Sequence, residues 1–365
     1  MDRFLKIDYI CIGYWPIFGG TETVVRKIAE IMAKRGHDIT VHTSFYNPNY
    51  KGELKASETF NGVKIKRHKL FPLYIFFPKI KNPQIVHLFS YGDNFMIQAI
   101  LNGSEFLVGS PIGEEIYASH KIRNKILGKF VLKRFRKIFA MTFYEKKVLM
   151  KDYEIREDKI IVWPAGVDEV AFSAPDINNV HDEILKTSGT RYFVRLARID
   201  RVKFIEFGIN ILPLFPQLTY LVIGPFDDNN YLNELRQLAC KLGVEGRVIF
   251  TGRVNEDEKR FLLRGALFYL ISNHETFGAA TVEAMAQSVP IIGPNLEEYK
   301  DLLTDQVNAL IYEYGSISSC ANVVEKIIQN ETLRLELGKE GKIIAREKFS
   351  WDKIADVAEN IYRSF

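Results

Sequence analysis

Residues 272–294 read SNHETFGAATVEAMAQSVPIIGP and join a predicted strand to a predicted helix. The apolar run before them, 266–271, predicts a buried parallel strand, and the Ala, Val and Met residues after Gly278 predict a helix. The turn between them therefore lies at the carboxyl end of a strand. In open α/β sheets that edge binds ligands, and the N–H groups at the start of a helix attract anions.

Two acidic residues stand out in this stretch, Glu275 in the turn and Glu283 about two helical turns further on. Their spacing predicts one carboxylate near each end of an elongated ligand. Gly278 allows a close approach of the backbone, so the N–H groups here can meet a phosphate or a sugar hydroxyl. The candidate binding residues of this turn are Phe277, Gly278, Ala279 and Ala280. The alternative is a capped helix, with Glu275 near the helix dipole and Glu283 as a surface charge.

The whole string resembles the donor-site signature of the retaining GT-B glycosyltransferases of family 4, in E-T-F-G, E-A-M-A and V-P-I-I. The resemblance implies that Glu275 holds a sugar hydroxyl and Glu283 the nucleotide ribose. It also implies two Rossmann-like, doubly wound parallel-sheet α/β domains that face an interdomain cleft. The implied activity is retaining transfer of a sugar from a nucleotide-diphosphate sugar to an acceptor hydroxyl, without a metal or another cofactor.

Length and composition predict a globular protein of two domains in a reducing compartment. The chain has 365 residues, 47% hydrophobic and 26% charged, which is typical of globular proteins of two domains. The longest apolar run, 70–78, is far shorter than the ~20 residues of a membrane span, and the charged start does not resemble a signal peptide. Three isolated cysteines favour a reducing compartment over a disulfide framework or a zinc site.

Alternating strand and helix patterns predict the domain boundaries. We expect an N-terminal domain over 1–170, a linker over 171–190 and a nucleotide-sugar domain over 191–348, with a terminal helix, 349–365, that resembles the family helix returning to the first domain. The predicted strands are 7–13, 38–43, 85–89, 105–108, 137–142, 160–163, 191–196, 218–224, 247–251, 266–271, 289–292 and 309–312.

Other loops supply further candidates for the donor site. Gly19 and Gly20 lie in P-x-x-G-G-x-E, which is either a simple turn or, by resemblance, the loop that faces the donor phosphates. Arg198 and Lys203 resemble the family pattern G-R-x4-K, with Ala197 in place of Gly, and are expected to neutralise the leaving diphosphate. The loops expected to border the base contain Gly224, Arg253 and Val254.

One departure from the family pattern concerns the acceptor side. Where the family commonly has a His, after the strand in F-L-V-G-S-P-I-G, this chain has Ile112 or a neighbour. Together with Ala197, this leaves open a non-catalytic carbohydrate- or surface-binding protein on a degenerate GT-B scaffold. His87 lies on an apolar strand and is interpreted as a core histidine.

The first half of the chain is basic, and its charge suggests the kind of acceptor. Residues 1–175 hold 27 Lys and Arg against 18 Asp and Glu. The stretch 120–139, HKIRNKILGKFVLKRFRKIF, predicts an amphipathic helix that either binds an anionic membrane, with Phe130 and Phe135 inserted, or packs on its own domain. A basic and aromatic patch at Lys64, Lys66, Arg67 and Lys69 adds to it. We therefore expect a carbohydrate or lipid-linked acceptor at the inner face of a membrane; without a recognised motif, nucleic acid is not expected.

Overall fold

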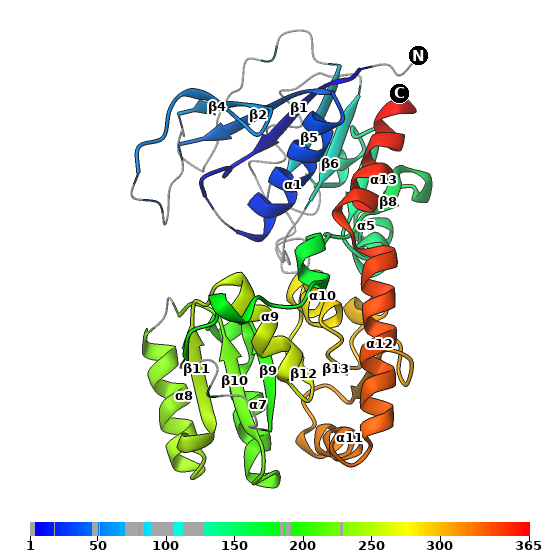
Figure 1. Ribbon diagram of the computed structural model, residues 1–365. Coiled ribbons are helices and arrows are strands. Elements are labelled where there is room, and N and C mark those ends of the chain that lie inside the picture. The colour runs from blue at the N-terminus through cyan, green and yellow to red at the C-terminus, as the bar shows by residue number, and fades with distance from the viewer. Residues whose placement is uncertain are drawn as a thin grey trace. The chain divides into compact units, whose positions relative to one another are not determined.

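The computed structural model describes residues 4–17, 19–45, 50, 52–69, 80, 84–89, 106–111, 128–182, 186, 191–226 and 229–365. The chain divides into two compact units (Figure 1). The N-terminal unit comprises Met1–Gly166 and Trp351–Phe365, and the C-terminal unit comprises Val167–Ser350. Each is a largely parallel sheet with flanking helices, which agrees with the predicted α/β class.

The described part of the N-terminal unit contains a sheet in the order β3-β4-β2-β1-β5-β6-β7-β8. All neighbouring strands are parallel except β3 and β4, which form an antiparallel hairpin at the edge. The strands are β1 (Lys6–Cys11), β2 (Asp38–Ser44), β3 (Ser57–Phe60), β4 (Val63–His68), β5 (Ile85–Phe89), β6 (Leu107–Ser110), β7 (Lys137–Ala140) and β8 (Ile160–Val162).

Strand β4, which lies between β3 and β2, shows that the predicted basic patch was partly wrong. Val63, Ile65 and Arg67 point inward along this alternating strand, whereas Lys64 and Lys66 point to solvent. Arg67 is buried, lies 2.5 Å from Glu58 and donates to two backbone carbonyls. Arg67 is therefore a structural cation and not part of an exposed basic surface.

The described part of the predicted basic helix over 120–139 is also shorter than expected. Residues 112–127 lie outside the described part, helical structure ends at residue 132, and β7 begins at Lys137. Val131, Leu132 and Phe135 are buried in the core of the N-terminal unit. Insertion of Phe135 into a membrane was therefore a wrong expectation, because it would require opening this core. Phe130 is 65% exposed.

Two cations of this stretch are engaged within the protein. Lys129 lies 2.5 Å and Lys133 3.7 Å from the carboxylate of Glu154, which follows helix α5 (Phe143–Tyr153). For residues 128–139, the alternative of a segment that packs on its own domain is thus the better description.

Helix α13 (Trp351–Arg363) belongs to the N-terminal unit and packs against α1 (Gly20–Lys34) (Figure 1). Trp163 donates its indole N–H to the carbonyl of Ile354, 2.8 Å away. Glu359 accepts hydrogen bonds from Arg35 and His37, which follow α1. His87 is fully buried between Tyr362 of α13 and Ser110, as expected of a core histidine.

The C-terminal unit has a parallel sheet in the order β11-β10-β9-β12-β13-β14. Its strands are β9 (Tyr192–Leu196), β10 (Thr219–Ile223), β11 (Val248–Gly252), β12 (Tyr269–Leu270), β13 (Ile291–Pro294) and β14 (Ala309–Tyr312). Its α-helices are α7 (Ile205–Ile211), α8 (Asn229–Lys241), α9 (Glu256–Gly265), α10 (Ala279–Ala286), α11 (Ile317–Gln329) and α12 (Glu331–Lys348).

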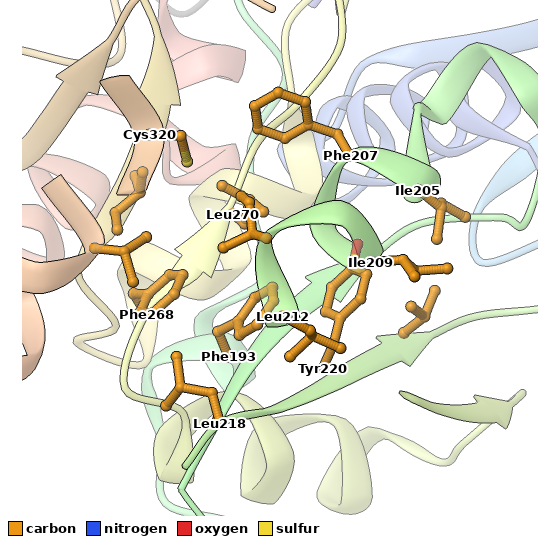
Figure 2. Close-up of a cluster of buried hydrophobic side chains, with 14 of the residues drawn as sticks. Phe193, Ile205, Phe207, Ile209, Leu212, Leu218, Tyr220, Phe268, Leu270 and Cys320 are labelled. Atoms are coloured by element: carbon orange, nitrogen blue, oxygen red, sulfur yellow. The ribbon is translucent and has the colours of Figure 1, made fainter. Parts of the chain in front are cut away.

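Aromatic stacking fixes neighbouring strands in the core of this unit (Figure 2). The ring of Phe193 on β9 stacks on Tyr220 of β10 at 4.5 Å and on Phe268 at 4.9 Å. Because offset aromatic pairs add to the free energy gained by burial, this cluster anchors the centre of the sheet that carries the candidate site.

Part of the expected linker, 171–190, is packed structure. Ala171, Phe172 and Val180 are buried, and Asp176 and Asn179 donate hydrogen bonds to Asp257 at the start of α9. The division of the chain falls at Val167, so the described part of this segment belongs to the C-terminal unit.

Candidate active site

Three strand ends of the C-terminal unit are joined by backbone hydrogen bonds. Ala197 donates to Ile223, and Gly224 donates to Gly252. Gly224 has φ +145°, and a Cβ built on it would lie 2.2 Å from the carbonyl oxygen of Ala197. A side chain is therefore excluded at Gly224, and the loops after β9, β10 and β11 form one continuous edge.

Glu275 lies beside two cations at the adjoining strand end. Lys203 Nζ is 3.0 Å from Oε1 and 2.9 Å from Oε2 of this carboxylate, and Arg195 Nη2 is 3.0 Å from Oε1. Burial would raise the pKa of Glu275, but Lys203 and Arg195 outweigh it and hold the pKa below its usual value. Glu275 is therefore ionised at neutral pH. It lies before Gly278, which caps α10 (Ala279–Ala286), and not in the first turn of that helix as in the alternative interpretation.

Arg195 is the site residue that the sequence did not reveal. It lies within the strand sequence Y-F-V-R-L, and its side chain is only 1% exposed. The guanidinium also donates to the amide oxygen of Asn273 and, at 3.3 Å, to the hydroxyl of Tyr269. The one signal in the sequence was a charged residue inside an apolar strand, because such a residue requires a buried partner.

The loop that carries Lys203 is attached to the turn that carries Glu275. Asp200 caps the short 3₁₀ turn η5 (Arg201–Lys203) through the N–H of Val202. The hydroxyl of Ser272 donates to the carbonyls of Lys203 and Phe204, at 3.2 and 2.9 Å. These bonds place Lys203 and Glu275 together although 72 positions separate them in the chain.

Arg198 has a different environment from its predicted companion Lys203. Its guanidinium lies 3.1 Å from Asp200, and its side chain is 54% exposed. The structure therefore brings Lys203 to Glu275 and leaves Arg198 at the solvent-facing side of the same loop.

The turn after β12 has the backbone geometry predicted for close approach. Gly278 precedes α10 with φ +85°, and Thr281 donates its N–H to the carbonyl of Gly278. Phe277 is buried against Phe349, whereas Ala279 is exposed and Ala280 is partly exposed at the first turn of the helix. The N–H groups of a first helical turn have no partner within the helix, so they suit an anion.

Glu283, on α10, forms an ion pair with Lys259 of α9 at 2.6 Å. Burial raises the pKa of Glu283 in spite of Lys259. Burial would lower the pKa of Lys259, but Glu283 and Glu256 raise it above its usual value, so this lysine is charged. Lys259 is thus a second functional candidate that the sequence did not indicate.

The remaining predicted residues lie at least partly exposed, on loops or at the start of a helix. Arg253 is exposed and Val254 partly exposed after β11, while Gly19 and Gly20 are exposed at the start of α1 in the N-terminal unit. The carboxylate of Glu22 folds back over Gly19, where a Cβ would lie 2.2 Å from its Oε2. Burial raises the pKa of Glu22.

Ile112, at the position where the family commonly has a His, lies outside the described residues. In the described ranges, no group of three His, Cys, Asp or Glu residues is placed to hold a metal ion. Nor does this part of the chain contain a helix that is long and apolar enough to cross a membrane.

The two largely parallel sheets, and the turn of residues 272–278 at the carboxyl end of β12, define a protein of the GT-B glycosyltransferase class. Residues 176–343 match the family described as glycosyl transferases group 1, and residues 18–170 match glycosyltransferase family 4. The two matches span most of both units, and the chain belongs to the group 1 glycosyltransferases.

Relatives and solved structures agree with this assignment. N-acetyl-alpha-D-glucosaminyl L-malate synthase of Bacillus anthracis is 22% identical over 98% of this chain and 96% of its own. Alpha-monoglucosyldiacylglycerol synthase of Streptococcus pneumoniae is 26% identical, over 49% of this chain and 42% of its own. The structure of Anabaena HepE in complex with UDP superposes with a TM-score of 0.82 at 17% identity, over 99% of this chain and 100% of that one, which shows the shared fold.

Proposed function

We propose that this glycosyltransferase is a retaining enzyme that transfers a sugar from a nucleotide-diphosphate sugar to an acceptor hydroxyl, without a metal. The observation that carries the proposal is the ionised Glu275 beside Lys203 at the carboxyl edge of the C-terminal sheet. A carboxylate accepts hydrogen bonds from sugar hydroxyls, and an adjacent cation attracts the diphosphate.

Each charged residue has a distinct role in this proposal. Glu275 orients the sugar through its hydroxyls, and Lys203, with Arg198, neutralises the negative charge that develops on the departing diphosphate. Glu283 accepts a hydrogen bond from the ribose, with Lys259 keeping its carboxylate in place. Two cations at the leaving group, Lys203 and Arg198, would do the work that a metal ion does in other transferases.

Retention follows, in this proposal, from attack on the same face of the sugar that the diphosphate leaves. The acceptor oxygen bonds to the anomeric carbon as the bond to the phosphate oxygen breaks, and the acceptor proton passes to that phosphate oxygen. The first N–H groups of α10 and the backbone at Gly278 would stabilise the product diphosphate.

For the acceptor, we propose a lipid-linked or polysaccharide hydroxyl. The support is the positive N-terminal unit, together with relatives named for a glucosyldiacylglycerol and for capsular polysaccharide biosynthesis. The cytoplasm is the proposed compartment.

The test is a screen of UDP-, GDP- and ADP-sugars by thermal shift, followed by proton NMR of the turnover of the donor that binds. A ligand that binds the folded chain raises its melting temperature by mass action. We expect stabilisation by one nucleotide class and release or transfer of the sugar with its anomeric configuration kept. Inversion would contradict the retaining mechanism, and binding of carbohydrate without any nucleotide sugar would favour the non-catalytic alternative.

A further inference from the structure

The two cations that hold Glu275 are built in different ways. Lys203 belongs to a short 3₁₀ turn, its side chain is 18% exposed, and a lysine has a flexible stem with a single charged nitrogen. Arg195 projects from β9, is 1% exposed, and has its planar guanidinium fixed by Asn273, by Tyr269 and, at 3.4 Å, by the carbonyl of Leu270. One of these cations can move, and the other is fixed.

We propose that Arg195 is a positioning residue that keeps Glu275 an oriented carboxylate after Lys203 has turned to the donor diphosphate. The inference rests on the proposed function, which assigns Lys203 to the diphosphate and Glu275 to the sugar. Without a second cation, the departure of Lys203 would leave a partly buried carboxylate uncompensated at the moment the sugar needs it.

The two carboxylate oxygens of Glu275 have different hydrogen-bond donors. Oε1 of Glu275 accepts from both Arg195 and Lys203, at 3.0 Å each, whereas Oε2 accepts from Lys203 at 2.9 Å. When Lys203 moves, Arg195 still holds Oε1, and Oε2 becomes the oxygen offered to a sugar hydroxyl.

Two further ionisable groups of the described residues interact with this carboxylate, and both are phenols, which do not supply positive charge. The phenols of Tyr269, on β12, and Tyr299, on the 3₁₀ turn η8 (Glu297–Tyr299), interact with Glu275, and burial raises the pKa of both. Both phenols are therefore neutral at physiological pH. With Lys203 engaged by the donor, Arg195 is the cation that remains in contact with Glu275.

Another buried arginine of the same unit provides a structural control. Arg260 donates to the carbonyls of Val170 and Ala174, at 3.3 and 2.9 Å, and contacts Asp257. We expect replacement of Arg260 to disturb the packing of the segment 170–174, just as replacement of Arg195 disturbs the sheet. Replacement of Arg260, however, removes no positive charge that contacts Glu275.

The experiment is a carbon-13 NMR titration of glutamate carboxyls in the full chain, with Glu275 assigned by the loss of its signal in E275Q. Wild type, R195Q, R195K, K203Q, R195Q/K203Q and R260K are titrated down from pH 7. A cation in contact with a carboxyl group lowers its pKa by about one to three units. We therefore expect R195Q to raise the titration midpoint of Glu275 by about one pH unit or more, both in the wild-type chain and in the K203Q chain. R195K should restore much of the shift, and R260K should leave the midpoint unchanged.

Equal Glu275 midpoints with and without Arg195 would overturn the proposal. If the R195Q proteins do not fold, the K203Q variant decides alone. In K203Q, Arg195 must keep Glu275 ionised at pH 7, and a protonated Glu275 would overturn the proposal. The titration uses no donor, so it is independent of the proposed function. Calorimetry of wild type with UDP-glucose, GDP-mannose and ADP-glucose tests the proposed function separately. Failure of all three to bind would count against the proposed function and not against the role of Arg195.

Discussion

Arg198 and Arg201 are two half-exposed cations of one loop that should differ in their importance for catalysis. Arg198 is 54% exposed and contacts Asp200, while Arg201 is 57% exposed and contacts Glu234 at 2.5 Å. Because Arg198 is assigned to the leaving diphosphate, R198A should slow donor turnover about 100-fold, the effect of removing one group that stabilises transition-state charge. R201A is the matched control and should stay within about twofold of wild type, as surface substitutions do. Equal rates for R198A and wild type in a donor hydrolysis assay would refute the role of Arg198.

Single residues show what the sequence could indicate about the candidate site and what it could not. Glu275, Glu283 and Lys203 stood out because they occur in strings that resemble a known signature. Arg195 and Lys259 did not, because their importance arises from contacts with residues 80 and 24 positions away. A sequence pattern gives the type of a residue, but not the partner that the fold brings to it.

At the scale of elements, the loop after β10 should tolerate no side chain. In G224A, the new methyl would lie 2.2 Å from the Ala197 carbonyl at a positive φ, so the loops after β9 and β10 must separate. We expect a loss of about 1–3 kcal/mol in the free energy of unfolding, measured with urea. The control is G246A, where the added Cβ has no atom within 4 Å. Similar stabilities for the two variants would show that the strand ends are not tightly joined.

The contact between α13 and the segment after α1 should depend on pH. Burial alone would raise the pKa of Glu359, but hydrogen bonds from Arg35, Arg363 and His37 lower it to about 2. A carboxyl whose pKa is lower in the folded state stabilises the protein above its unfolded pKa of about 4.3, and this contribution is lost as pH falls toward 2.

E359Q should therefore lower the free energy of unfolding by about 1 kcal/mol at pH 7, and the difference from wild type should shrink between about pH 4 and pH 2. The control is E336Q, on the exposed side of α12. Chemical denaturation at several pH values measures both. A difference that is constant with pH would show that the ion pairs of Glu359 do not stabilise the fold.

Most of the parallel strands were predictable from their apolar runs, and 85–89 and 309–312 agree with β5 and β14 at both ends. The β3–β4 hairpin was missed because β4 alternates Val, Ile and Arg inward with Lys outward, and its three basic residues obscured the strand pattern. The sequence left open whether the basic segment before β7 binds a membrane or packs on its own domain. In its described part, Val131, Leu132 and Phe135 are buried in the core, whereas Phe130 is exposed.

At the scale of the whole molecule, the two units carry opposite charge. The N-terminal unit holds 29 Lys and Arg against 19 Asp and Glu, or +10, and the C-terminal unit 20 against 26, or −6, which together give the net +4. A positive unit attracts anionic surfaces, each basic residue near the surface contributing about 1 kcal/mol.

We therefore expect the protein to sediment with phosphatidylglycerol vesicles at low salt and to be released at 1 M salt, where the Debye length falls from ~10 Å to ~3 Å. Because Phe135 is buried, little binding should resist high salt. Phe130 is exposed, so F130A should remove any salt-resistant binding to the vesicles. Phosphatidylcholine vesicles are the control. Protein that stays in the supernatant with anionic vesicles at low salt would remove the main support for a lipid-linked acceptor.

Calorimetric titration with UDP, GDP and ADP, on wild type and K203M, tests the proposed donor site most directly. Methionine replaces the unbranched lysine side chain by an unbranched, uncharged one that is one atom shorter. Glu275 retains Arg195, so the site should stay folded. We predict that at least one nucleotide binds wild type with one site per chain, and that K203M binds it at least about tenfold more weakly, as loss of a charge-assisted contact implies. If no nucleotide binds wild type, or if K203M binds as tightly, the site at Glu275 and Lys203 is not where the donor diphosphate is held.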